Sequence, residues 1–291
     1  AAGHRAVGVG SRRRRRVVAD VERDPQSAGV ARVADDADTA EKAIRSFLRS
    51  ATSEAASRAK HRADEARAAK EAERALKNGA HGVQLGTNVN GKAIDGPEFW
   101  PLYEVIEKSG KPILLHPARS REMLDYQGET KSKYEICSVL GWPFETSVAL
   151  SRFIFSKIMD TYPKLKIVSH HLGGVIPYLE GRVGHSFDQM GVRTSDEDYE
   201  GLRKSLKKRP FDYFKDFYAD TAIEGVRAPM LCGLDFFGFD KVLFASDCPF
   251  DKEKGPGYIR STIAVLESID MKPADREKIS YKNAQALFGV K

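Results

Sequence analysis

Beyond residue 80, short runs of apolar and β-branched residues alternate with segments of helical pattern, and this alternation constrains the fold more than any other feature. Strands separated by helices are typical of a parallel sheet with right-handed crossovers. Five strand–helix units in about 210 residues match the density of a (β/α)8 TIM barrel, which takes roughly 250 residues in all. Strands are expected at 81–86, 112–116, 165–170, 217–220 and 241–245, and the main helices at 97–108, 143–161, 174–190 and 225–236.

The first 80 residues differ from the rest in composition. They carry 18 Lys and Arg against 12 Asp and Glu, whereas residues 81–291 carry 29 of each, and Phe47 is their single aromatic residue. The run Arg12–Arg16 cannot be buried and is expected to be solvated. We therefore predict two regions. Residues 1–80 form an atypical basic, Ala/Arg-rich segment with a helix at about 39–78, and residues 81–291 form the barrel domain.

Strands 4–8 of this predicted barrel are clear, and strands 1–3 are poorly represented. The N-terminal region offers only short β-branched pieces at 16–21 and 29–33 as strand candidates. Two helices or three are expected after the last strand.

Composition also excludes several classes of protein. No run approaches the ~18 apolar residues that a membrane span needs. Cys137, Cys232 and Cys248 are too few and too scattered for a disulfide framework, so a cytoplasmic location is expected. A nucleic-acid partner is not expected, because no aromatic residues interleave with the arginine run that phosphates would attract.

Three of the five predicted strands end in residues that bind metals or move protons. His116 ends one strand, His170 and His171 end the next, and Asp247 follows the last. The carboxyl ends of parallel strands meet at one rim, so these side chains are expected to lie together. Imidazoles with a carboxylate form the ligand set of a divalent ion such as zinc, which could activate a water or polarise a substrate oxygen.

Each of these residues also has a structural interpretation. A lone strand-end histidine is often a satisfied polar residue, and Asp247 could cap the following helix. The coincidence at three strand ends favours function. Of the neighbours His170 and His171, one side chain is expected to point into the barrel mouth and the other to pack outside.

Further residues could bind a substrate. Arg119 and Arg182 are candidate clamps for a carboxylate, with a solvated arginine as the alternative for each. Trp142 could wall a pocket for a planar substrate or could belong to the core. Gly173 and Gly174 are expected to open a helix whose amide end can hold an anion.

Residues 81–291 resemble the amidohydrolase-related family that includes aminocarboxymuconate-semialdehyde decarboxylase. The likeness rests on four segments in the expected order, and the His-x-Gly-Gly and Ser-Asp-x-Pro-Phe elements are specific as a set. The segments are Gly82-Val83-Gln84-Leu85, Ile113-Leu114-Leu115-His116-Pro117, His170-His171-Leu172-Gly173-Gly174 with Pro177-Tyr178, and Phe244-Ala245-Ser246-Asp247-Cys248-Pro249-Phe250.

The resemblance implies a barrel of the metal-dependent hydrolase type with one divalent metal, usually zinc. It implies carbon–carbon bond cleavage or hydrolysis of small, often aromatic or ring-fission, carboxylic acids. By position, His116 would be a metal ligand, His171 the catalytic histidine, and Asp247 a metal ligand that also handles protons. A homodimer is a further expectation from the family.

One departure from the family pattern leaves the function open. The family has a His-x-His pair on its first strand as two metal ligands, and this chain has none; Asp20-Val21-Glu22 is the nearest substitute. The N-terminal region is either divergent or the product of a shifted reading frame. The main prediction is a metal-dependent lyase (decarboxylase) or hydrolase, and the alternative is a catalytically impaired barrel that acts as a binding protein.

Overall fold

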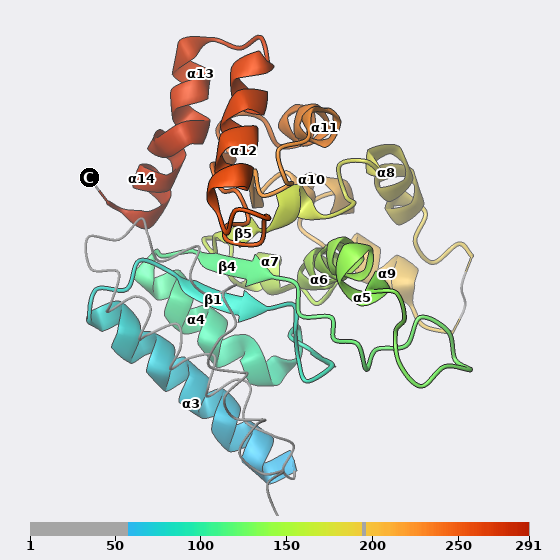
Figure 1. Ribbon diagram of the computed structural model, residues 1–291. Helices are drawn as coiled ribbons and strands as arrows, with labels where there is room; N and C mark the ends of the chain where they lie inside the picture. The colour runs from blue at the N-terminus through green and yellow to red at the C-terminus, as the bar shows by residue number, and fades with distance from the viewer. Residues whose placement is uncertain (1–57, 194–195, 291) are drawn as a thin grey trace, which may run out of the picture.

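The computed structural model describes residues 58–193 and 196–290, which enclose a parallel sheet with helices packed on it (Figure 1). Neighbouring strands follow chain order, and every pairing in this sheet is parallel, with Gly86 level with His116 and Asp220 level with Leu243. The strands are β1 (Val83–Gly86), β4 (Ile113–His116), β5 (Ile167–Ser169), β6 (Tyr218–Asp220) and β7 (Val242–Leu243). All five lie within the predicted strand ranges, so the prediction for this part of the barrel is confirmed.

Helices connect these strands and close the chain. A short antiparallel hairpin, β2 (Asn88–Val89) with β3 (Lys92–Ala93), follows β1. The described helices are α3 (Arg58–Lys77), η3 (Pro97–Phe99), α4 (Trp100–Ser109), α5 (Ile136–Val139), α6 (Gly141–Phe155), α7 (Ile158–Thr161), η4 (His171–Gly173), α8 (Glu180–Asp188), α9 (Tyr199–Lys204), α10 (Pro210–Phe214), α11 (Arg227–Phe237), α12 (Pro256–Ser268), α13 (Pro273–Glu277), η5 (Lys278–Lys282) and α14 (Asn283–Phe288).

Two predicted helices differ from those observed. The helix expected at 143–161 is divided into α6 and α7, because Lys157 has φ 65° and interrupts the helical backbone. The helix expected from residue 174 begins only at Glu180, because the backbone from His171 to Gly174 is left-handed. The strand candidates at 16–21 and 29–33, Asp20-Val21-Glu22 and the arginine run lie outside the described residues, as does the first half of the helix predicted at 39–78.

One face of the sheet packs against the helices. Ile113, Leu115 and Ile167 point to this side and are almost fully buried, together with Phe153 of α6. Burying a side chain of this size stabilises the fold by roughly 1.5–3 kcal/mol. Helix α3 lies along α4 and buries small side chains, namely Ala68, Ala69, Ala72 and Ala75 (Figure 1). A stripe of alanines lets two helices approach closely but buries little apolar area, which agrees with the alanine-rich pattern of this segment.

The other face of the sheet carries a smaller apolar cluster. Leu114, Val168 and Leu243 pack there with Leu287 of α14. Side chains alternate between the faces of a strand, so residues two positions further on point to the same side. His116, His170 and Asp220 follow Leu114, Val168 and Tyr218 by two residues. The sheet therefore directs these three polar side chains to one face, at the carboxyl ends of β4, β5 and β6.

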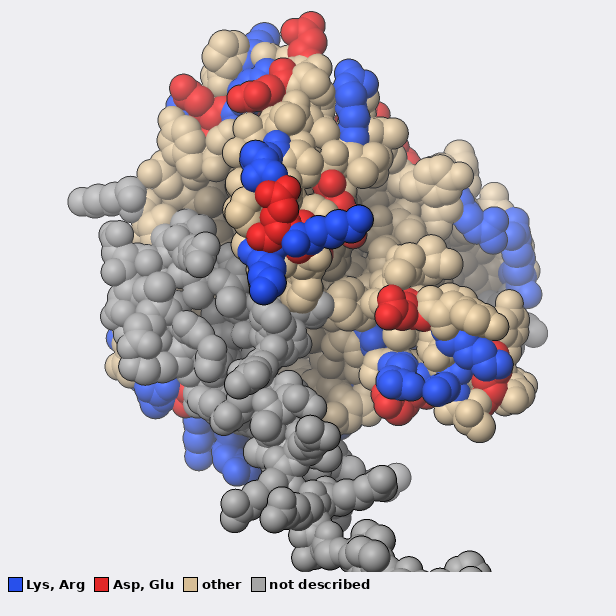
Figure 2. Space-filling model, in the orientation of Figure 1, with Lys and Arg blue, Asp and Glu red and all other residues tan. Residues whose placement is uncertain are grey.

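The surface carries both signs of charge in close proximity. On the face shown in Figure 2, basic and acidic side chains lie next to one another in several groups. This mixture agrees with the balance of charge beyond residue 80. None of the described helices has the length and apolar character that crossing a membrane requires.

Candidate active site

His116 ends strand β4 with its ring turned toward the histidines of the next strand. Its Nδ1 lies 2.8 Å from the carbonyl oxygen of Pro117. A carbonyl only accepts hydrogen bonds, so Nδ1 carries the hydrogen and Nε2 keeps its lone pair when the ring is neutral. Burial, with the nearby His170 and His171 rings, lowers the pKa of His116 to about 3. The ring is therefore neutral at physiological pH, with Nε2 as its free donor atom.

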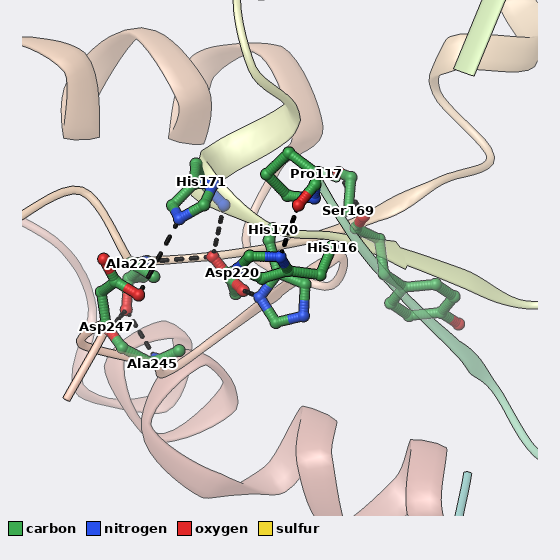
Figure 3. A network of polar contacts seen from close by, with 11 residues as sticks. His116, Pro117, Ser169, His170, His171, Asp220, Ala222, Ala245 and Asp247 are labelled. Atoms are coloured by element: carbon green, nitrogen blue, oxygen red, sulfur yellow. Dashed lines mark hydrogen bonds and ion pairs between the residues drawn. The ribbon is translucent and has the colours of Figure 1, made fainter. Parts of the chain in front are cut away.

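His170 forms a buried pair with Asp220. The His170 Nδ1 lies 2.7 Å from Asp220 Oδ2 (Figure 3). The Asp220 side chain is almost fully buried. Asp220 Oδ1 accepts the backbone N–H groups of His171 at 3.0 Å and Ala222 at 3.1 Å. Burial raises the pKa of the Asp220 carboxyl, but the facing His170 and these contacts outweigh it, and the pKa lies below its usual value. Asp220 is thus an ionised carboxylate.

His171 faces the carboxylate of Asp247. Its Nε2 lies 3.9 Å from Asp247 Oδ1, an ion-pair distance. Burial lowers the pKa of His171, but the carboxylates of Asp247 and Asp220 more than offset this and raise it above its usual value. His171 is therefore suited to carry a proton beside Asp247.

The structure brings together His116, His171 and Asp247, the three residues predicted to bind the metal or to act in catalysis. The ring centroid of His116 lies 5.6 Å from that of His171, and His171 reaches Asp247. The His170 ring belongs to the same cluster, 5.1 Å from His116 and 6.1 Å from His171. The expectation that one of the two neighbouring histidines packs outside is therefore wrong. His170 lies two residues after Val168 and therefore points to the same face of the sheet. The left-handed backbone at His171 turns the His171 side chain toward that face as well.

Three residues at or next to this cluster have a strained backbone. His171, Leu172 and Asp247 have φ values of 55°, 53° and 60°, a left-handed conformation that residues with a Cβ rarely adopt. Such a conformation costs on the order of 1–3 kcal/mol for each residue and is common where a site must hold side chains in place. Both residues predicted to be catalytic, His171 and Asp247, are held in this way.

Trp142 lies against the cluster, whereas neither candidate clamp has a hydrogen bond or ion pair with a cluster residue in the described structure. The Trp142 ring is edge-on to the His116 ring, with centroids 5.5 Å apart. Trp142 Nε1 donates a hydrogen bond to the Arg119 carbonyl oxygen at 2.9 Å. The Arg119 guanidinium donates to the carbonyl oxygen of Leu124 at 3.2 Å, and its buried Nε has no hydrogen-bond partner in the described structure. Arg182 is exposed on α8.

The anion site expected at the start of a helix after Gly173 and Gly174 is not formed, because no α-helix begins there. Gly174 instead allows close packing: a Cβ at this position would lie 2.2 Å from the carbonyl oxygen of Pro143. Its φ of 66° also favours glycine.

Asp220 was not singled out as a site residue from the sequence. It ends strand 217–220 just as His116 ends its own strand. The signal that could have found it is its even spacing from Tyr218, which faces the same side of the sheet.

The donors present do not make a complete metal site. His116 Nε2 and the Asp247 carboxylate are of the types that bind divalent cations. Among residues 58–193 and 196–290, no group of three His, Cys, Asp or Glu side chains is arranged to hold a metal ion. The full sequence also contains no His-x-His. The described residues therefore supply two suitable donors and not a closed coordination shell.

A cavity of about 700 Å³ lies away from this cluster, at the amino ends of the strands. Lysines and carboxylates line it, among them Lys166, Lys241, Asp160 and Asp216. None of the residues predicted to form the site contributes to it.

Known proteins resemble this chain over much of its length. A 2-amino-3-carboxymuconate-6-semialdehyde decarboxylase of Dictyostelium discoideum is 30% identical over 74% of this chain and 55% of the relative. A gamma-resorcylate decarboxylase of a Polaromonas species is 29% identical over 67% of this chain and 55% of the relative. The chain thus spans about half the length of the curated relatives it matches.

The fold also matches solved structures. A 5-carboxyvanillate decarboxylase of Novosphingobium aromaticivorans, crystallised with manganese and a nitrobenzoic acid, superimposes with a TM-score of 0.67 at 22% identity, covering 92% of this chain and 74% of that one. This likeness, to decarboxylases of the TIM-barrel type, confirms the predicted fold class. The family model described as amidohydrolase matches residues 6–290. A match over nearly the whole sequence shows that this chain belongs to the amidohydrolase family.

Proposed function

We propose that this chain catalyses the decarboxylation of a small aromatic or ring-fission carboxylic acid. The observation that carries the proposal is the meeting of His116, His171 and Asp247 at one edge of the sheet, with His171 Nε2 3.9 Å from the carboxylate. The relatives named above are decarboxylases of such acids, which favours this reaction over hydrolysis.

The chemistry needs a proton donor next to the carbon that loses its carboxylate. The bond between that carbon and the carboxyl carbon breaks, CO2 leaves, and the electron pair that remains on the carbon takes a proton from His171 Nε2. Asp247 faces the same nitrogen and stabilises the positively charged imidazolium before transfer. A positioned acid of this kind contributes typically 10²–10⁴-fold to a rate.

Two residues are proposed to hold the substrate. The Trp142 ring, edge-on to His116, would form one wall for a planar molecule. Arg119 is proposed to bind the carboxylate, supported by its buried Nε, which has no hydrogen-bond partner in the described structure. This role requires the guanidinium to exchange its contact with Leu124 for the substrate.

We infer that His116 and Asp247 are ligands of a divalent cation, with zinc as the ion. The proposal is supported by the free Nε2 of His116, since a neutral imidazole held by a backbone carbonyl is a common zinc ligand. A bound cation would polarise a substrate oxygen. The solved relative that contains manganese makes manganese the competing ion.

Assays with 2,6-dihydroxybenzoate and 5-carboxyvanillate test the proposal, with CO2 release and product measured after incubation with zinc or with manganese. Turnover should be lost in His171→Asn and Asp247→Asn and kept in His185→Asn, which changes an exposed histidine of α8. Binding of these acids without turnover under every condition would favour the impaired-barrel alternative. Hydrolysis of an ester or lactone without CO2 release would favour a hydrolase.

We also propose that a second copy of the chain covers an apolar surface beside the site. Val139 and Leu140 of the α5 region and Phe144 of α6 are each more than half exposed and lie within six residues of one another. Large apolar side chains grouped on a surface commonly mark an interface. Light scattering should give the mass of a dimer, and Leu140→Asp should shift it toward the monomer. A monomeric parent chain would refute the proposal.

The thiols support the predicted cytoplasmic location. Cys137, Cys232 and Cys248 are all free in the structure. Free cysteines fit a reducing compartment, and the location itself stays a prediction.

A further inference from the structure

We propose that Asp220 is a positioning residue whose single carboxylate fixes the imidazole of His170 through one oxygen and the backbone of His171 through the other. Its importance for the reaction rests on the proposed function, whereas the arrangement itself can be tested without any activity. The proposed reaction uses neither residue of the His170–Asp220 pair.

The two carboxylate oxygens have different partners. Oδ2 lies 2.7 Å from His170 Nδ1, and Oδ1 accepts the His171 N–H at 3.0 Å and the Ala222 N–H at 3.1 Å (Figure 3). The Asp220 side chain is 4% exposed and that of His170 is 11% exposed, so water cannot replace these contacts easily. Asp220 therefore connects the ends of two neighbouring strands.

The contact with Oδ2 determines which nitrogen of His170 is free. An ionised carboxylate only accepts hydrogen bonds, so the hydrogen of His170 must be on Nδ1. His170 Nε2 is then the nitrogen left over, and it is buried without any hydrogen-bond partner in the described structure. A buried polar atom without a partner is rare and calls for an explanation. A substrate bound beside His116, whose ring is 5.1 Å away, would supply that partner.

The contact with Oδ1 supports a strained turn. His171 and Leu172 have φ values of 55° and 53°, and Gly173 and Gly174 also have positive φ. The His171 N–H is the first donor of this turn, and Asp220 holds it. This anchor keeps the His171 ring close to Asp247, because a shift of the His171 backbone would move Nε2 away from the carboxylate.

Replacing Asp220 with Asn separates the two roles. The amide oxygen can stay in the place of Oδ1 and accept the His171 and Ala222 N–H groups. The amide NH2 then takes the place of Oδ2 and donates to His170 Nδ1, which forces the ring hydrogen to Nε2. Asp220→Asn should keep the turn and reverse the tautomer, whereas Asp220→Ala should lose both contacts.

The decisive measurement is the 15N NMR spectrum of the histidine rings in the full chain without added metal. In the parent protein, His170 Nδ1 should carry a hydrogen. In Asp220→Asn, Nδ1 should lose it, and in the matched control Asp235→Asn, an exposed aspartate of α11, nothing should change. Where the parent decarboxylates, Asp220→Asn should lower kcat about 10–100-fold, the usual effect of losing a carboxylate behind a functional histidine.

Two outcomes would overturn the inference. One is a parent protein in which His170 Nδ1 has no hydrogen, which is decisive even if Asp220→Asn does not fold. The other is a folded Asp220→Asn protein whose His170 tautomer is unchanged. A parent chain without decarboxylase activity would refute the proposed function and leave the NMR test of Asp220 intact.

Discussion

The two ends of the same sheet differ in whether their polar side chains have hydrogen-bond or ion-pair partners. At the amino ends, Lys207 Nζ donates to the Asp160 carbonyl oxygen at 2.7 Å, Lys166 Nζ donates to the Gly110 carbonyl oxygen at 3.2 Å, and Lys208 pairs with Asp216. At the carboxyl ends, His170 Nε2 and His171 Nδ1 are buried without hydrogen-bond partners in the described structure.

The difference teaches where chemistry is to be expected. The amino end has the cavity of about 700 Å³ and more formal charges, but four of the lysines that line it contact protein oxygens, namely Lys166, Lys207, Lys208 and Lys241. The carboxyl end has buried imidazole nitrogens without hydrogen-bond partners in the described structure and residues with left-handed backbone, which are features common where a protein binds another molecule. Each prediction below compares a change at one end with a change at the other.

The largest effect should come from the proton donor. His171→Asn should lower decarboxylation at least ~100-fold, because a positioned acid contributes about 10²–10⁴-fold. Lys166→Ala, at the opposite end of β5, should leave the rate within about twofold. Steady-state kinetics on both variants checks this. Equal losses in the two would show that the ends are not functionally distinct.

The next largest effect should be on bound zinc, which should depend on residues at the carboxyl ends of the strands and not on residues at the amino ends. The parent protein, after incubation with zinc and gel filtration, should hold about one ion per chain, because a single divalent ion is expected at such a site. His116→Ala and Asp247→Ala should each lower that occupancy several-fold, and Lys241→Ala should not. Elemental analysis by mass spectrometry gives the result. Unchanged zinc in His116→Ala would remove this residue from the proposed ligands.

At the amino end, stability rather than activity should respond. Tyr213 is buried, and its hydroxyl donates to Asp160 Oδ1, so Asp160→Ala removes the acceptor of that hydroxyl. The free energy of unfolding should fall by about 1–3 kcal/mol, with turnover per folded molecule unchanged. Urea unfolding of the variant and the parent measures the first quantity. A loss of specific activity as large as that in His171→Asn would contradict the comparison.

Tyr213 should also make the folded state less stable at high pH. Burial, and next the hydrogen bond to Asp160, raise the pKa of Tyr213 to about 12. An unfolded tyrosine ionises near pH 10, so the folded state favours the neutral phenol. This contribution is fully present below about pH 10 and is lost as the pH rises toward about 12. In Tyr213→Phe, the decline of the melting temperature over this range should be smaller than in the parent.

The smallest effect should come from the Lys208–Asp216 pair, both of whose side chains are at least one third exposed. Lys208→Ala should change the free energy of unfolding by less than about 1 kcal/mol, because water screens exposed ion pairs. The change should shrink further in 0.5 M salt. A larger, salt-independent loss would point to packing of the lysine stem on Tyr213, over whose ring its Nζ lies at 4.7 Å.

The pattern of strands could be predicted because it rests on local sequence. Ile113-Leu114-Leu115 and Ile167-Val168-Ser169 are short apolar runs between helical segments, and the parallel pairing follows from that order. The meeting of His116, His171 and Asp247 follows in turn, because parallel strands end at one rim. The roles of these residues, and of Arg119 and Trp142, stay predictions.

The geometry within the cluster could not be predicted in the same way. The left-handed turn at His171 and the break at Lys157 involve residues that rarely have positive φ, so nothing in their identity announces them. The pairing of His170 with Asp220 depends on side chains from strands about 50 residues apart. Alternation along β5 and β6 places both on one face, but only the packed structure shows that they are in contact.

Helix α14 covers the smaller apolar cluster of the sheet with Leu287, and the C-terminal residues are therefore needed to keep this cluster away from water. The Phe288 carbonyl oxygen also accepts from Lys111 Nζ at 2.5 Å and lies 3.0 Å from His81 Nδ1, so the last turn of this helix is bonded to residues that precede β1 and β4. Trimming the tail by ten residues would expose Leu114, Val168 and Leu243 to solvent and invite aggregation. Purification tags and fusion partners that disturb this turn would carry the same risk.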